Sequence, residues 1–135
     1  MDLVYRGSDS DFSKESYFKA CENKDNTIGF VQTTDGEVFG GYTSYPIKDT
    51  GGIAIDSKAF LFSVTHQQKY AVRMNNHSGA LIYNDNMFPF GDAIGIKNEC
   101  HTKGDNYVRF AGRDRNSYQQ ATGPAEHLRN MKYKV

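Results

Sequence analysis

The sequence contains no tryptophan, only two cysteines and three prolines, and no excess charge of either sign. Two cysteines allow at most one disulfide, which excludes a disulfide-stapled scaffold. Because acidic and basic residues balance at 16 each, no overall field attracts nucleic acid or an anionic membrane. No apolar run is long enough for a membrane span, and the N-terminal one is too short for a signal peptide. We therefore expect a cytoplasmic or nuclear protein with free thiols.

The usual motifs of metal, phosphate and nucleophile sites are also missing. The cysteines and the four histidines show neither a Cys-x-x-Cys nor a His-x-x-x-His spacing, so no zinc site is predicted. There is no Gly-x-Ser-x-Gly elbow, and residues 48–52 lack the lysine and hydroxyl that complete a phosphate loop. Candidate carboxylates are spread along the chain, at Glu37, Asp56, Asp92 and Glu99. We expect no metal, no cofactor and no enzymatic activity.

What the chain does contain favours β-structure. Its 135 residues correspond to one domain, 1–135, and 18 of them are Phe or Tyr, with 13 Gly. Short runs of β-prone residues follow one another between turn residues. The predicted strands are Thr27–Thr33, Glu37–Thr43, Ala59–Val64, Lys69–Arg73, Ala80–Tyr83, Ala93–Ile96 and a closing strand with Met131, Tyr133 and Val135. Strands of this number and spacing predict a two-sheet antiparallel β-sandwich with minor one-turn helices in its loops.

One helix is predicted near the N-terminus, from Ser13 to about Glu22. Ser13 is a natural N-cap, and Glu15 lies in the first turn, where a negative charge complements the helix dipole. Tyr17, Phe18 and Cys21 form the apolar face. Because this face is narrow, we expect the helix to lie against a sheet edge.

The segment 33–44 is the most informative part of the chain. Asp35-Gly36 between two β-prone runs predicts a hairpin turn with Gly36 at positive φ. Gly40 and Gly41 interrupt the second run, and adjacent glycines in a strand mark a bulge or a close approach of another group. A neighbouring strand is the favoured group, and a binding partner is the alternative.

Five pieces of the sequence, in this order and at these spacings, resemble the TLDc domain of oxidation-resistance proteins and some nuclear receptor coactivators. They are Leu3–Ser8, Asp11–Ser13 with Phe18–Lys24, Thr33–Ser44, Ser57–Val64 and Phe90–Cys100. The likeness is dense from Leu3 to Val64, returns at residues 88–100 and is thin from Thr102 onward. The resemblance implies the same β-sandwich.

The resemblance also implies a function. TLDc domains are non-enzymatic protein-interaction modules, associated with protection against oxidative stress and with binding and regulation of the vacuolar proton-pumping ATPase. A contact surface that follows the family's motif pieces would contain Gly40, Gly41, Tyr42, Ser44, Phe90, Gly91 and Asp92. The chain departs from the family pattern in a short loop before Phe90 and in a closing strand without an acidic residue, which leaves room for a different protein partner.

Two alternatives follow from the residues themselves. Cys100 stands beside His101 and Lys103, a setting that favours a thiolate and hence a redox-responsive protein. Basic residues gather toward the C-terminus, interleaved with Tyr and Phe, and this combination suits phosphate contacts and base stacking. The basic residues of this segment are Arg109, Arg113, Arg115, Arg129, Lys132 and Lys134. Packing and solvated strand faces are the simpler explanation for the thiol and for the basic segment, respectively.

Overall fold

A computed structural model describes residues 1–49, 51–72, 81–83, 87–90, 93–102, 106–108 and 131–133. Two helical elements come first, the 3-10 turn η1 (Gly7–Asp9) and the helix α1 (Lys14–Cys21). All the other elements that the structure describes are strands, and every pair among these strands is antiparallel. The prediction of a mainly β, antiparallel chain with a short N-terminal helix and a one-turn helix is confirmed.

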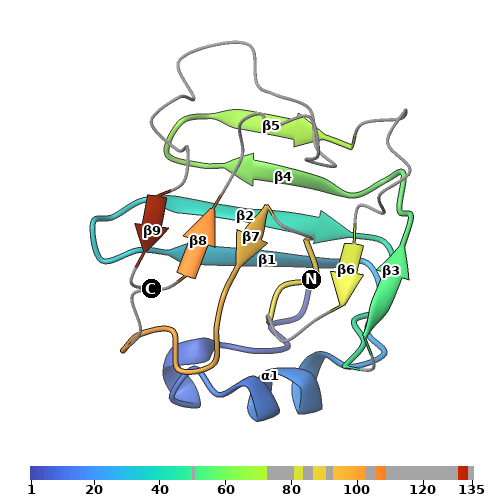
Figure 1. Cartoon of the computed structure of the whole chain (residues 1–135), viewed down its shortest axis with the longest axis horizontal. Coiled ribbons are helices and arrows are strands. Elements are labelled where there is room, and N and C mark those ends of the chain that lie inside the picture. Colours follow the sequence, from blue (N-terminus) through green and yellow to red (C-terminus); the bar gives the residue numbers. More distant parts are fainter. Residues whose placement is uncertain are drawn as a thin grey trace.

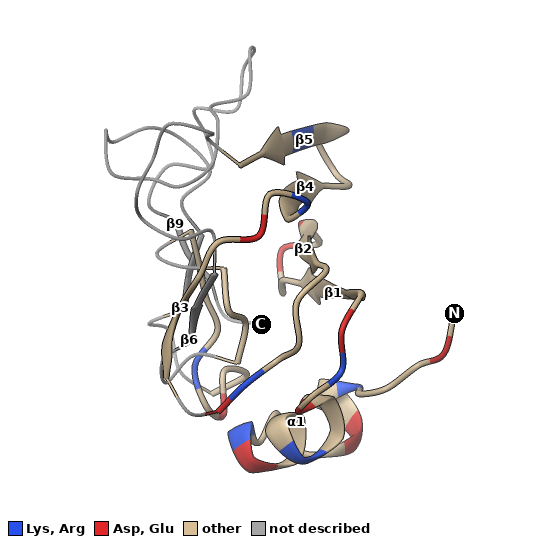
Figure 2. Ribbon diagram, turned by 90° about the vertical axis from the view of Figure 1, so that its right-hand side faces the viewer, with Lys and Arg blue, Asp and Glu red and all other residues tan. Residues whose placement is uncertain are grey.

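The helix α1 forms where its capping residue predicts. The Ser13 hydroxyl accepts a hydrogen bond from the Ser16 backbone N–H at 3.4 Å, which satisfies one of the free donors of the first turn. The predicted apolar face, Tyr17, Phe18 and Cys21, is buried. Figures 1 and 2 show α1 below strand β1 (Thr27–Gln32), beside the edge of the largest sheet, as the narrow face predicted.

The largest sheet has four strands in the order β1-β2-β4-β5. After β1 come β2 (Val38–Thr43), β4 (Phe60–Ser63) and β5 (Gln68–Ala71). Successive side chains of a strand point to opposite faces, so each strand contributes to an inner and an outer face. Phe39, Leu61 and Tyr70 point inward and are almost fully buried, at 1%, 0% and 1% exposure.

The remaining strands form two smaller sheets. One pairs β3 (Gly52–Ala54) with β6 (Leu81–Tyr83), and the other contains β7 (Ile94–Gly95), β8 (Asn106–Val108) and β9 (Met131–Tyr133). In Figure 2, β3, β6 and β9 lie on one side of the four-stranded sheet, and no described helix or strand covers its opposite side. A sandwich of just two sheets is not confirmed, because the described strands form three hydrogen-bonded sheets.

The hydrophobic core lies between the four-stranded sheet, α1 and the segments that cross in front of the sheet in Figure 1. Phe90, Ala93, Ile94 and Cys100 from the crossing segments are at most 2% exposed. Tyr17 of α1 stacks on the half-buried Phe88 with a centroid distance of 6.1 Å. This packing fixes which face of the four-stranded sheet is inner and which is outer.

Candidate interaction surface

The turn between β1 and β2 has the predicted geometry. Gly36 has φ 90°, in the left-handed region that favours glycine. Its N–H donates to the Thr33 carbonyl at 3.1 Å, and the Thr33 N–H donates to the Glu37 carbonyl at 2.9 Å. This is a three-residue hairpin loop with glycine at its last position.

The two adjacent glycines of β2 lie at positions that point to opposite faces of the sheet. A Cβ on Gly40 would collide with the carbonyl oxygen of Gly29 in β1 and with the Phe62 ring on the outer face. A Cβ on Gly41 would lie 2.5 Å from the Phe90 ring in the core. The neighbouring strand approaches Gly40 closely, as the sequence favoured, whereas the close approach to Gly41 is made by an aromatic ring of the core.

The glycines at 29 and 41 are register partners across β1 and β2. Phe88 lies over Gly29 and Phe90 lies over Gly41, and the two rings are 6.0 Å apart. This pair of small residues makes room for the segment Met87–Phe90 to pack directly on the sheet backbone.

The predicted contact residues that the structure describes lie on both faces of the sheet. Gly41 and Phe90 are buried in the core, whereas Tyr42 lies on the outer face and Gly40 beneath the Phe62 ring there. Gly91 and Asp92 lie outside the described residues. A contact surface made of all seven residues stays a prediction.

The outer face of the four-stranded sheet carries exposed and half-buried apolar side chains from three neighbouring strands. We call it the aromatic face, and its side chains are Ile28, Phe30, Tyr42, Phe60, Phe62 and Lys69. Ile28 is 38% exposed and Phe30 is 59% exposed. Strand alternation places Ile28 and Phe30 together, but sequence reasoning did not single them out as site residues.

The rings of the aromatic face hold one another in place. Phe30 meets Phe62 edge-on at 5.2 Å, and Tyr42 stacks on Phe60 at 5.2 Å. The Tyr42 hydroxyl donates to Asn26 Oδ1 at 3.0 Å. The Lys69 ammonium lies over the Phe60 ring, 4.1 Å from its centroid, in a cation–π contact.

Ser44, another predicted contact residue, is part of a buried polar cluster at the end of β2. Asp56, which is 1% exposed, accepts hydrogen bonds from the Ser44 hydroxyl at 2.8 Å and the Ser44 N–H at 2.7 Å. It also accepts from the Thr43 hydroxyl and the Lys58 N–H. Burial alone would raise the pKa of Asp56, but these hydrogen bonds outweigh it and lower the pKa below its ordinary value. The cluster ties β2 to the chain before β4.

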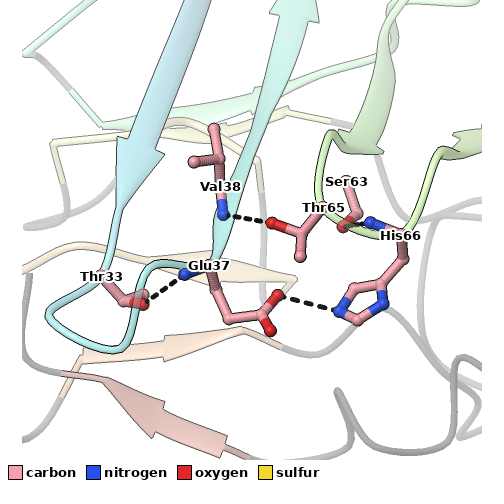
Figure 3. Close-up of polar contacts among 6 residues, drawn as sticks. All are labelled: Thr33, Glu37, Val38, Ser63, Thr65 and His66. Atoms are coloured by element: carbon pink, nitrogen blue, oxygen red, sulfur yellow. Dashed lines mark hydrogen bonds and ion pairs between the residues drawn. The ribbon is translucent and has the colours of Figure 1, made fainter.

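A second polar cluster joins the turns at one end of the sheet, as Figure 3 shows. His66 Nε2 lies 2.8 Å from Glu37 Oε2, and the Val38 N–H donates to the Thr65 hydroxyl at 2.8 Å. The Ser63 hydroxyl accepts from the His66 backbone N–H at 3.2 Å, so this contact does not pair a nucleophile with the imidazole. The cluster links the β1–β2 turn to the β4–β5 turn.

Both cysteines are buried free thiols. Cys21 is 8% exposed and Cys100 is 0% exposed. Burial raises the pKa of each thiol to about 11, which disfavours the reactive thiolate at neutral pH. Lys103, which the sequence placed near Cys100, lies outside the described residues. The described surroundings of Cys100 are therefore those of a packing residue.

The basic segment is mostly outside the described residues. Arg109, Arg113, Arg115, Arg129 and Lys134 all fall there, and Lys132 lies in β9. Within the described residues, no group of three or more His, Cys, Asp or Glu side chains could hold a metal ion. The described helices include none with the length and apolar character needed to cross a membrane.

A protein-family model matches most of the chain. The model of the TLDc domain matches residues 1–127. The chain belongs to the TLDc family. No protein of curated function matches it in sequence. The match covers β1 through β8, so the four-stranded sheet with its aromatic face belongs to the TLDc part of the chain.

Proposed function

We propose that this TLDc domain is a non-enzymatic protein-interaction module. The observation that carries the proposal is the aromatic face, an exposed set of apolar side chains on a sheet whose other face forms the core. Exposed apolar patches on a soluble domain mark sites of interaction. The ring contacts within the face order it before any partner arrives, which reduces the entropy cost of binding.

The polar clusters of the described residues support a structural role over catalysis. Asp56 is enclosed by hydrogen bonds from its own chain, and Glu37 pairs with His66 between two turns. The raised pKa of both thiols argues against a nucleophilic cysteine and against a redox role for Cys100. The interaction module is therefore the better supported of the alternatives.

The family resemblance extends the proposal to a partner and a process. TLDc domains are associated with the vacuolar proton-pumping ATPase and with protection against oxidative stress, so we propose subunits of this ATPase as partners in the cytoplasm. The short loop before Phe90 and the closing strand without an acidic residue are the features most apt to alter that contact.

The test is capture from native lysate with the purified chain, with and without peroxide, followed by mass spectrometry. Enrichment of vacuolar ATPase subunits over resin that carries no protein supports the proposal. Recovery of nucleic acid without protein, or capture only after oxidation of Cys100, would replace the proposal with one of the two alternatives.

A further inference from the structure

The aromatic face combines exposed apolar side chains with a single cation. Register and alternation place Ile28, Phe30, Gln32, Val38, Gly40, Tyr42, Phe60, Phe62, Lys69 and Ala71 on this side of the sheet. No acidic residue is among them. Lys69 contacts the Phe60 ring and forms no ion pair within the described part of the chain. The face thus offers a positive charge that a partner's carboxylate would complement.

This charge pattern separates the classes of partner. A second copy of the same face brings no carboxylate for Lys69, so self-association leaves both cations unpaired. Nucleic acid presents a dense row of phosphates and is bound through several cations, whereas this face has one. An anionic membrane likewise attracts clusters of basic residues. An acidic protein segment with apolar side chains matches the face best.

The dimensions of the sheet favour a helical conformation for the acidic segment. The free surface is the outer side of the sheet, which no described helix or strand covers (Figure 2), while α1 lies beside the β1 edge (Figure 1). A helix of about 10 Å diameter laid on strands about 4.8 Å apart covers roughly two of them. The rings of β2 and β4 then meet the apolar stripe, with the exposed Phe30 and Ile28 of β1 on one flank of the helix and Lys69 of β5 on the other.

We propose that the aromatic face binds an acidic amphipathic helix of a partner protein. Its apolar side chains pack on Phe30, Phe62 and Tyr42, and a carboxylate on its flank pairs with Lys69. Docking of a helix through i, i+3, i+4 and i+7 anchors is a common mode of peptide recognition. The inference rests on the proposed interaction function and deepens it by naming the chemistry and the form of the partner segment.

The experiment uses a phage-displayed library of a helical scaffold with one face randomised, selected on the full chain. We expect the enriched helices to carry apolar residues at helical spacing with Asp or Glu beside them. Phe30→Gln should weaken their binding at least tenfold. Ile53→Gln is the matched control, because Ile53 is 67% exposed on β3 and lies outside the face, and it should bind as the unaltered chain does.

Lys69→Met tests the charge while keeping an apolar stem over Phe60. This variant should bind acidic helices several-fold less tightly than the unaltered chain does. Its affinity for versions of the same helices with glutamine in place of the acidic residues should equal that of the unaltered chain. Enrichment of basic helices, no enrichment, or equal binding by Phe30→Gln would overturn the inference. A dimer seen by sedimentation that Phe30→Gln abolishes would instead assign the face to a second copy, and competition by single-stranded RNA would assign it to nucleic acid.

The outcome is separable from that of the proposed function. If Phe30→Gln still captures vacuolar ATPase subunits, the proposed interaction function is supported and the assignment of the aromatic face as its surface is wrong. If the selected helices bind as expected but the ATPase is never captured, the aromatic face is supported as a helix-binding surface and the proposed partner is wrong. Circular dichroism melting of each variant checks that the substitution leaves the fold intact.

Discussion

The ring of Phe90 occupies the space above Gly41 in which a side chain at position 41 would begin. A Cβ there would lie 2.5 Å from the ring, closer than real Cβ contacts come. Gly41 pairs with Gly29 in register, and Phe88 lies over Gly29 in the same way. The inner face of β1 and β2 is thus shaped to receive two aromatic rings, which leaves the outer face to carry the exposed ones.

Gly41→Ala should destabilise the fold by about 2 kcal/mol, because overpacking displaces the Phe90 ring from a close-packed core. The measurement is urea denaturation. Phe90→Leu replaces the colliding ring with a smaller side chain. The double variant Gly41→Ala with Phe90→Leu should therefore lose less stability than the sum of the two single losses. Strict additivity of the two free-energy changes would show that the residues are not in contact.

Gly36→Val should lower the free energy of unfolding by about 1 kcal/mol or more, through backbone strain alone. No atom lies within 4 Å of a Cβ built on Gly36, so crowding contributes nothing. Gly36→Asn is the matched variant, because asparagine tolerates the left-handed region. Equal denaturation midpoints for the valine and asparagine variants, with unchanged slopes, would rule out the positive φ.

Asp56→Asn should destabilise the fold at neutral pH by about 2 kcal/mol, because hydrogen bonds to a charged acceptor are the stronger ones. The pKa of Asp56 is lowered by folding, so its stabilisation is fully present above the unfolded pKa of about 3.9. It is lost as pH falls through the folded pKa.

Denaturation midpoints of the unaltered chain and of Asp56→Asn between pH 7 and pH 3 check this. The difference should be constant near neutrality and shrink at the acid end. A difference that grows as the solution is acidified would mean that Asp56 is protonated in the folded state.

The thiols should resist alkylation in the native state and react on unfolding, since burial raises the pKa of both to about 11. Cys100 should label more slowly than Cys21, because it is 0% exposed against 8%. This order is the reverse of the one that His101 and Lys103 suggested in the sequence. Mass spectrometry of iodoacetamide-treated protein measures both rates, and rapid native labelling of Cys100 would restore its candidacy as a sensor.

Local features of the fold were predictable from the sequence. The Ser13 cap, the Asp35-Gly36 turn and the alternation in β1, β2 and β4 each depend on residues near one another in the chain. Strands β3 and β8 were missed, because Gly52–Ala54 begins in turn residues and Asn106–Val108 follows a polar stretch. Their pairing depends on distant partners, which no local pattern reveals.

The candidate surface was less predictable for the same reason. Alternation alone says that Gly40 and Gly41 face opposite ways, but only the layering shows which side Phe90 fills. The exposure of Phe30 depends on which elements cover the sheet, and those elements come from remote parts of the chain. The contact between Lys69 and Phe60 likewise needs the register of β4 with β5.

Site-specific photo-crosslinking tests the central claim, that the aromatic face is the interaction surface, most directly. A photoreactive phenylalanine analogue placed at Phe30, and for comparison at Ile53, is irradiated with the chain bound to its partners in native lysate. We expect discrete crosslinked protein bands from Phe30 and none from Ile53, with the attached peptides acidic and amphipathic. Crosslinks from Ile53 alone, or none from Phe30 while partners still co-purify, would contradict the account.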